Sequence, residues 1–94
     1  MKDYEIVKKR KLAANVDEYT VFAPMVAKHC LAGQFIILRT DENGERVPFT
    51  ICDYSREKQT VSILVQEVGY TTYKLATMNE GDALHDFVGP LGNP

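Results

Sequence analysis

An Asn-Gly pair at positions 43 and 44 lies between two apolar runs and constrains the fold more than any other feature of the sequence. The first run is residues 35–38, and the second lies within residues 46–52. Asn-Gly between two such runs is the strongest short-range signal for a β-hairpin, because both residues accept the positive φ angles of a tight turn. The centre of the chain is therefore predicted to be a pair of antiparallel strands.

Three further segments carry strand signals before the last third of the chain. Residues 4–12 are rich in Tyr, Ile and Val, and residues 61–65 alternate apolar with polar or smaller side chains. Residues 55–59 form a polar turn between the hairpin's return strand and residues 61–65. The third segment, residues 19–26, places apolar side chains on one face at Tyr19, Val21, Ala23 and Met25.

The sequence changes character after residue 69, where a short helix is predicted over residues 71–79. Either Thr71 or Thr72 can cap its N-terminus with a side-chain oxygen. Leu75 and Met78 are three positions apart, so they share one face of a helix and are predicted to point inward.

A sixth strand is predicted over residues 82–88. Residues 89–94 hold two glycines and two prolines, so they are predicted to form neither strand nor helix and to act as a linker. Six short strands and one short helix predict an all-β domain over residues 1–88. A closed antiparallel barrel is the expected form, because closure removes the exposed strand edges.

Composition narrows the class of function. A length of 94 residues corresponds to one domain, and a net charge of −2 argues against a nucleic-acid or acidic-membrane binder. No stretch approaches the roughly 20 apolar residues that a membrane span needs. The N-terminus shows no apolar signal segment, so a cytoplasmic location is expected.

The cysteines and histidines suggest no chemistry of their own. Cys30 and Cys52 lie outside any CxxC pair and are expected to be free thiols, with Cys52 a buried small hydrophobe. His29 and His85 have no companions at ligand spacing, so no metal site is predicted. No Ser/His/Asp set or carboxylate pair stands out, so no catalytic residue is assigned.

Three blocks of sequence, taken in order, carry a resemblance to a known family. They are residues 33–39 with 45–51, then residues 65–72, then residues 80–84 leading to 89–94. Together they resemble the flavin domain of the ferredoxin–NADP reductase superfamily. Within it they are most similar to the small subunit of NADH-dependent ferredoxin–NADP oxidoreductase, also described as the sulfide dehydrogenase β subunit. The electron-transfer subunit of dihydroorotate dehydrogenase is the next nearest group.

The resemblance implies a six-stranded antiparallel Greek-key barrel that holds FAD, within an NAD(P)H-dependent oxidoreductase subunit. It implies that residues 89–94 begin a linker to an NAD(P)-binding domain absent from this chain. An iron–sulfur cluster in that missing part and a larger flavin and iron–sulfur subunit are the implied electron partners. Alone, the chain is expected to bind FAD poorly and to be inactive, and its bare domain face is a candidate homodimer contact.

The resemblance also assigns residues to the flavin. In related proteins the strand matching Val47, Pro48, Phe49 and Thr50 runs along the isoalloxazine ring. The Thr50 hydroxyl is the expected hydrogen-bond partner for the N5 region, with backbone groups of the other three lining the ring. The alternative is that this segment is ordinary strand, with proline marking a bulge.

The next strand supplies Leu64, Val65 and Gln66, which in related subunits pass the flavin and its ribityl chain. Gln66 is expected to hydrogen-bond there, or else to be an exposed strand residue.

The entry to the predicted helix supplies the remaining three assignments. Gly69 allows close backbone approach, and the hydroxyls of Thr71 and Thr72 are expected to donate to the FAD pyrophosphate at the helix N-terminus. The alternative reading is an ordinary helix cap.

One departure from the family pattern concerns the arginine that commonly clamps the pyrophosphate. Val47 occupies its position, and Arg46 is one residue early, which turns it to the other face of a strand unless a bulge intervenes. Arg46 is therefore expected to be a solvated hairpin residue. The basic run at residues 8–11 is likewise expected to be a solvated edge strand, with docking of an acidic partner as the alternative.

Two other classes of function stay open at this level. A small oligonucleotide-fold binding barrel requires aromatic and basic residues together on one face, which the few aromatics and negative net charge do not favour. A structural or interaction domain predicts an exposed apolar patch and no flavin affinity.

Overall fold

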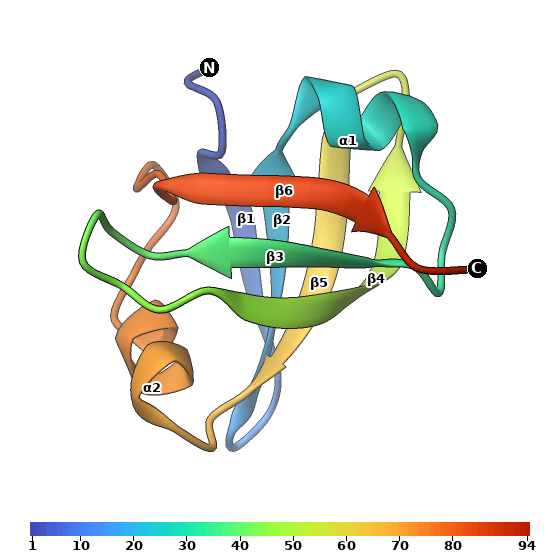
Figure 1. Ribbon diagram of the computed structural model, residues 1–94. Helices are drawn as coiled ribbons and strands as arrows, with labels where there is room; N and C mark the ends of the chain where they lie inside the picture. Colours follow the sequence, from blue (N-terminus) through green and yellow to red (C-terminus); the bar gives the residue numbers. More distant parts are fainter.

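The computed structural model describes residues 1–94 as six strands and two short helices (Figure 1). Their order along the chain is β1 (Ile6–Ala13), β2 (Val16–Phe22), α1 (Pro24–His29), β3 (Phe35–Arg39), β4 (Val47–Ser55), β5 (Thr60–Gln66), α2 (Tyr70–Ala76) and β6 (Asp86–Leu91).

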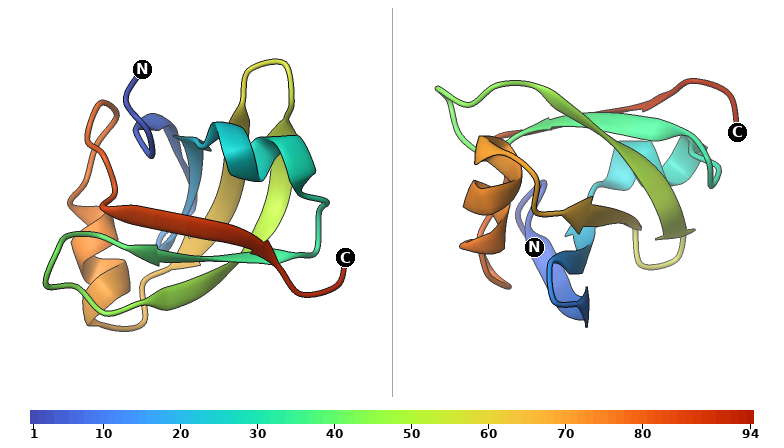
Figure 2. Two further views of the ribbon diagram at one scale, coloured as in Figure 1. Left: turned by 45° about the horizontal axis from the view of Figure 1, so that its top comes forward. Right: turned by 90° about the horizontal axis from the view of Figure 1, so that it is seen from below.

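The strands form one antiparallel sheet in the order β1-β2-β5-β4-β3-β6. Backbone bonds close it, because the Ile6 N–H donates to the Asp82 carbonyl at 2.8 Å and the Leu84 N–H to the Tyr4 carbonyl at 2.9 Å. In Figure 1, β1, β2 and β5 cross behind β3 and β6, and Figures 1 and 2 show α1 and α2 at opposite ends of the barrel. The predicted all-β Greek-key barrel is confirmed.

The core lies between these two layers and consists of 16 buried apolar residues. Tyr19, Val21 and Ala23 are buried, as their alternation predicted, and Leu75 from α2 packs on the same core with Met78 partly buried beside it. Each large side chain removed from water in this way contributes about 1.5–3 kcal/mol.

The fourth strand changes partner half-way along. Residues 47–50 of β4 pair with β3, whereas residues 51–55 pair with β5. Residues 64–66 of β5 pair only with β2. The first half of β4 and the second half of β5 therefore diverge, and β4 has a strand partner on only one side over residues 47–50.

A helix that the sequence pattern did not predict, α1, follows β2. The strand predicted over residues 19–26 ends at Phe22, because Pro24 has no N–H for a ladder bond but fits the first turn of a helix. Met25, predicted to point inward, is 67% exposed, and Val26 and Ala27 are buried instead.

The end of α1 is capped from the β4–β5 turn. The guanidinium of Arg56 donates to the carbonyls of Ala27, Lys28 and Cys30 at 2.6, 2.8 and 2.9 Å and lies over the Tyr54 ring. Replacing Arg56 with methionine is expected to lower the free energy of unfolding by about 1–2 kcal/mol, because three helix-end carbonyls lose a charged donor.

Chemical denaturation measures this loss. Arg56→Lys should restore only part of the stability, because one ammonium cannot reproduce the planar fork. Arg46→Met is the matched control, since Arg46 is exposed and makes no side-chain hydrogen bond. An Arg56→Met variant as stable as Arg46→Met would contradict the capping role.

The last strand extends into the tail that was predicted to be a linker. β6 runs from Asp86 to Leu91, with Leu91 opposite Phe35 of β3, so the prediction that residues 89–94 contain no strand is wrong. Pro90 is tolerated because β6 pairs with β3 on one side only, since the bonds that close the sheet lie before it at residues 82–84. Only glycine fits at position 89 without a shift of its neighbours, because a Cβ there would lie 2.8 Å from Ile36 Cγ2. The strand predicted over residues 82–88 therefore begins and ends later.

The second helix, α2, spans Tyr70–Ala76 rather than residues 71–79, and its end is held from β1 and β2. The Tyr19 hydroxyl donates to the Leu75 carbonyl at 2.7 Å, and burial raises the pKa of Tyr19, which keeps its proton in place. Lys9 Nζ donates to the carbonyls of Ala76 and Met78 at 2.8 Å. Lys9 is thus a helix cap, which corrects the prediction that the whole basic run is solvated.

Candidate functional site

The gap between the diverging halves of β4 and β5 is a pocket of about 450 Å³, which we call the β4–β5 pocket. The start of α2 and the segment before it form its end wall. Its lining residues are Val47, Pro48, Phe49, Thr50, Cys52, Leu64, Gln66, Val68 and Thr72.

Most of the residues that the sequence assigned to the flavin meet in this pocket. All four from β4, both Leu64 and Gln66 from β5, and Thr72 from α2 line it. Val65 does not, because the alternation of β5 turns it into the core, where it is 2% exposed. Gly69 and Thr71 lie beside the pocket rather than in its lining.

Two side chains bring free polar groups to the pocket. The hydroxyl of Thr50 and the amide of Gln66 are exposed to solvent and make no hydrogen bond to the rest of the protein, so a ligand in the pocket could replace the water on them. The surrounding walls are largely apolar, with Val47, Leu64 and Val68 among them. The pocket therefore combines largely apolar walls with a few hydrogen-bonding groups, which is the usual make-up of a small-molecule site.

Cys52 lines the pocket and is exposed, so its predicted burial is wrong. A register shift between Ile51 and Asp53 lies at this residue, and Ile51 takes the core position instead. Although the residue is exposed, its sulfur is partly buried where it donates to the Ser62 carbonyl at 3.3 Å, and this burial and then the nearby Glu18 carboxylate raise the pKa of Cys52. Cys30 is the fully buried cysteine.

The hydroxyls at the start of α2 are committed to internal bonds. Thr72 Oγ1 accepts the N–H groups of Val68 at 2.8 Å and Gly69 at 2.9 Å, and donates to the Gly69 carbonyl. Thr71 Oγ1 donates to a carboxylate oxygen of Glu45 at 2.8 Å. The predicted donation from these hydroxyls to a pyrophosphate stays a prediction, and it would require these bonds to break.

Contacts from the β3–β4 turn hold α2 against the barrel. Glu45 accepts from Thr71, and Lys74 forms an ion pair with Asp41. The hairpin predicted from the Asn-Gly pair is confirmed by the pairing of β3 with β4, but the tight turn is not: residues 40–46 join the strands, and neither Asn43 nor Gly44 has a positive φ. Within this loop the Gly44 N–H donates to the Asp41 carbonyl at 3.1 Å. These contacts fix the end wall of the β4–β5 pocket relative to the first half of β4.

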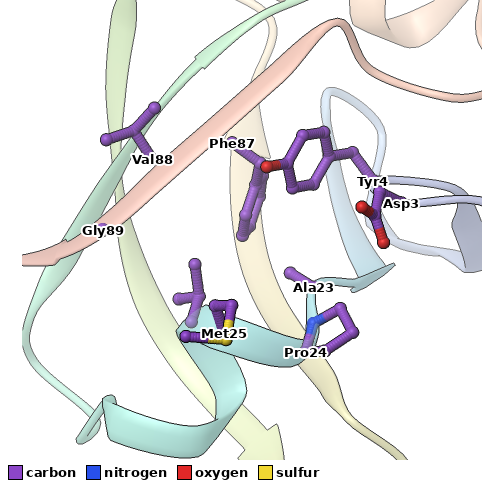
Figure 3. A pocket seen from close by; sticks show the side chains of 9 residues that line it. Asp3, Tyr4, Ala23, Pro24, Met25, Phe87, Val88 and Gly89 are labelled. Atoms are coloured by element: carbon purple, nitrogen blue, oxygen red, sulfur yellow. The ribbon is translucent and has the colours of Figure 1, made fainter.

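A second hollow, of about 360 Å³, lies at the other end of the barrel between α1 and β6 (Figure 3). The rings of Tyr4 and Phe87 stack within it with centroids 6.2 Å apart, and Met25 and Val88 lie nearby. None of the residues assigned to the flavin lies there.

The structure has no group of three or more His, Cys, Asp or Glu side chains placed to hold a metal ion. Neither helix has the length and apolar character that crossing a membrane requires.

Comparison with known proteins defines the class of this barrel. No protein-family model matches the chain. The structure superimposes on that of NADH-dependent reduced ferredoxin–NADP oxidoreductase with a TM-score of 0.96 and 42% identity, over 100% of this chain and 34% of the other. The cytochrome b5 reductase domain of Ulva prolifera nitrate reductase matches with a TM-score of 0.67 at 17% identity, which shows the fold alone. The fold is thus the ferredoxin-reductase-like barrel.

Relatives in sequence identify the group more narrowly. The chain is 44% identical over 90 residues to a homolog of the dihydroorotate dehydrogenase B electron transfer subunit from Thermotoga maritima, and covers 32% of it. It is 31% identical to that subunit from Bacillus pumilus, covering 35%. An uncharacterized Clostridium beijerinckii protein from the adh 3′ region is 54% identical and 31% covered. The resemblance to these two groups of reductase subunits, predicted from three sequence blocks, is confirmed. The chain spans about a third of these relatives.

Proposed function

We propose that this chain is the flavin-binding barrel of an oxidoreductase subunit and that the β4–β5 pocket holds the flavin. The observation that carries the proposal is the pair of unbonded polar side chains, Thr50 and Gln66, in a largely apolar pocket. Thr50 lies on the stretch of β4 that has a strand partner on one side only, and Gln66 lies on the diverging half of β5. Similarity to electron-transfer subunits supports it.

The residues of the pocket fit an isoalloxazine ring. The ring is a flat, largely apolar surface with hydrogen-bonding atoms along its edge, and a pocket near 450 Å³ lies in the range typical of ligand sites. Val47, Pro48 and Leu64 supply apolar contact, while Thr50 and Gln66 supply a hydroxyl and an amide. A bound flavin supplies hydride and electron transfer, whereas the chain binds and orients it.

The finer part of the proposal concerns the rest of the electron path. Pyridine nucleotide, an NAD(P)-binding domain and an iron–sulfur partner would come from outside these 94 residues, which span about a third of the relatives. We propose that this chain alone has no reductase activity, because the pocket is open on one side and the chain spans only about a third of its relatives. Enclosure by a second domain or by another copy of the chain would exclude water.

Thiol alkylation tests the location of the flavin. Cys52 lines the pocket, so FAD at ten times its dissociation constant should slow alkylation of Cys52 about tenfold, in proportion to the unliganded fraction. The raised pKa leaves little thiolate at neutral pH, so labelling should be run at mildly alkaline pH and mapped by mass spectrometry.

Two controls accompany this measurement. Cys30 is 0% exposed and should stay unlabelled with or without FAD, which reports that the protein remains folded. Adenosine at the same concentration should leave Cys52 labelling unchanged. FAD that binds without protecting Cys52 would place the flavin elsewhere. A protein that binds no flavin even when the downstream domain is restored would favour a binding or interaction module instead.

A further inference from the structure

One carboxylate stands directly beside the wall of the β4–β5 pocket. Glu18 of β2 lies opposite Leu64 of β5 in the antiparallel register, and Leu64 lines the pocket. Side chains at opposed positions of an antiparallel pair share one face of the sheet, with Cβ atoms about 4.5–5.5 Å apart. Glu18 therefore adjoins the pocket from the neighbouring strand, although it is not part of the lining.

A second residue of the lining also contacts this carboxylate. The Cys52 sulfur lies 3.8 Å from Glu18 Oε2, and Cys52 lines the pocket beside Leu64. The Glu18 side chain is only 18% exposed, so water and salt screen its charge less than that of an exposed carboxylate. The charge of Glu18 therefore lies within a few ångströms of two side chains that a bound ligand would touch.

The positive side chains near Glu18 lie outside the pocket. Arg10 is opposite Glu18 on β1 and forms an ion pair with it at 3.1 Å, but β1 is one strand farther from β5 and the Arg10 side chain is 56% exposed. Lys8 and Lys58 line a separate polar hollow, which Glu18 also lines. No Lys, Arg or His lines the β4–β5 pocket, so the charge of Glu18 is only partly balanced there.

The Cys52 thiol reports the sign of the charge at this wall. Its pKa is raised first by burial of the sulfur and then by Glu18, and Asp53 makes a smaller contribution in the same direction. The opposing influence on this pKa is a backbone hydrogen bond and not a cation. A ligand group in contact with Cys52 and Leu64 therefore lies in a field that disfavours additional negative charge.

A flavin ring gains negative charge when it is reduced. The oxidised ring takes up two electrons and one proton, and so carries one more negative charge afterwards. From the geometry at Leu64 and Cys52 we infer that Glu18 weakens the binding of reduced flavin relative to oxidised flavin, and so lowers the reduction potential of the flavin in this pocket. The inference rests on the proposed function and deepens it, because it assigns control of the potential to a residue outside the lining.

The reactivity of Cys52 in the flavin-free chain gives the first test. Glu18→Gln keeps the size of the side chain and removes its charge, so the fraction of Cys52 thiolate at a fixed pH below its pKa should rise about three- to tenfold. The pH dependence of alkylation, mapped by mass spectrometry, measures this fraction. Glu57→Gln makes the same change in net charge on the exposed β4–β5 turn and should leave Cys52 unchanged. Unchanged Cys52 reactivity in the Glu18→Gln protein would overturn the inference, because the charge would not reach the pocket wall.

The reduction potential of bound FAD gives the second test. With the chain in excess over FAD, titration with dithionite against a dye of known potential should show a higher potential in Glu18→Gln than in the unaltered chain. Reduced FAD should bind this variant about three- to tenfold more tightly relative to oxidised FAD, which corresponds to about 15–30 mV for a two-electron couple. Glu57→Gln should leave the potential unchanged.

The outcomes separate the inference from the proposed function. An unchanged or lowered potential in Glu18→Gln, with FAD bound, would overturn the inference and leave the proposed function standing. An equal rise in Glu57→Gln would also overturn it, because net charge alone would then explain the effect. Absence of flavin binding even when the downstream domain is restored would instead reject the proposed function, and the inference with it.

Discussion

Replacing Thr50 with valine and Gln66 with leucine together is expected to weaken flavin binding by about 10- to 100-fold. Each substitution keeps the size of the side chain and removes a hydrogen-bonding group that has no partner within the protein. A hydrogen bond to a ligand is worth about 0.5–1.5 kcal/mol, and each 1.4 kcal/mol is a tenfold change in affinity. Flavin fluorescence quenching measures the loss.

Stability should not change with this double substitution, because neither group stabilises the folded chain through a hydrogen bond. The matched control is Thr20→Val, which removes a strand hydroxyl paired with Ser62 at 2.9 Å outside the pocket. That change should cost some stability and leave flavin affinity unaltered. A Thr50/Gln66 double variant that binds flavin like the unaltered chain would remove the observation on which the proposed function depends.

Replacing Leu75 with alanine is expected to cost about 3 kcal/mol of unfolding free energy, through lost apolar burial and the cavity that remains. Leu75 is 1% exposed and is the side chain by which α2 packs into the core. A loss of this size is a large share of the stability of a small domain, so the thermal midpoint should fall clearly. Urea denaturation followed by circular dichroism measures the change.

Tyr73 provides the control on the same helix, because its side chain is 57% exposed. Tyr73→Ala should change stability by less than about 0.5 kcal/mol. Because α2 forms the end wall of the β4–β5 pocket, Leu75→Ala should also weaken flavin binding under conditions where the protein remains folded. A Leu75→Ala protein as stable as Tyr73→Ala would show that α2 does not depend on the core.

The barrel was predictable because its signals are local. Asn43-Gly44 marked the β3–β4 turn, and the alternation of Tyr19, Val21 and Ala23 gave the buried face of β2. The predicted flavin segments on β4 and β5 came from order and spacing of sequence blocks. The fold places most of their residues in one pocket.

The local errors share one cause, which is that partners distant in sequence decided the outcome. Helix α1 depends on Arg56 from another turn, and the strand in the tail depends on the neighbouring Phe35. Cys52 is exposed because a register shift at that point of the β4–β5 ladder gives Ile51 the core position. The sequence does not distinguish Lys9 from the other three basic residues at positions 8–11. Its role as a helix cap depends on the carbonyls of Ala76 and Met78 at the end of α2, which are far away in the sequence.

The amino-acid pattern by itself therefore determined the class of fold and the centre of the sheet, because hairpin turns and apolar alternation act over a few residues. The segments that could meet a flavin came from the resemblance of three sequence blocks to a known family. Only the tertiary structure decided where β4 exchanges β3 for β5, which is what opens the pocket. It also decided that the hydroxyls of Thr71 and Thr72 are used internally and that no charged side chain lines the site. Hydrogen-bond partners and pocket walls come from segments far apart in the chain, and no local pattern records which of them will meet.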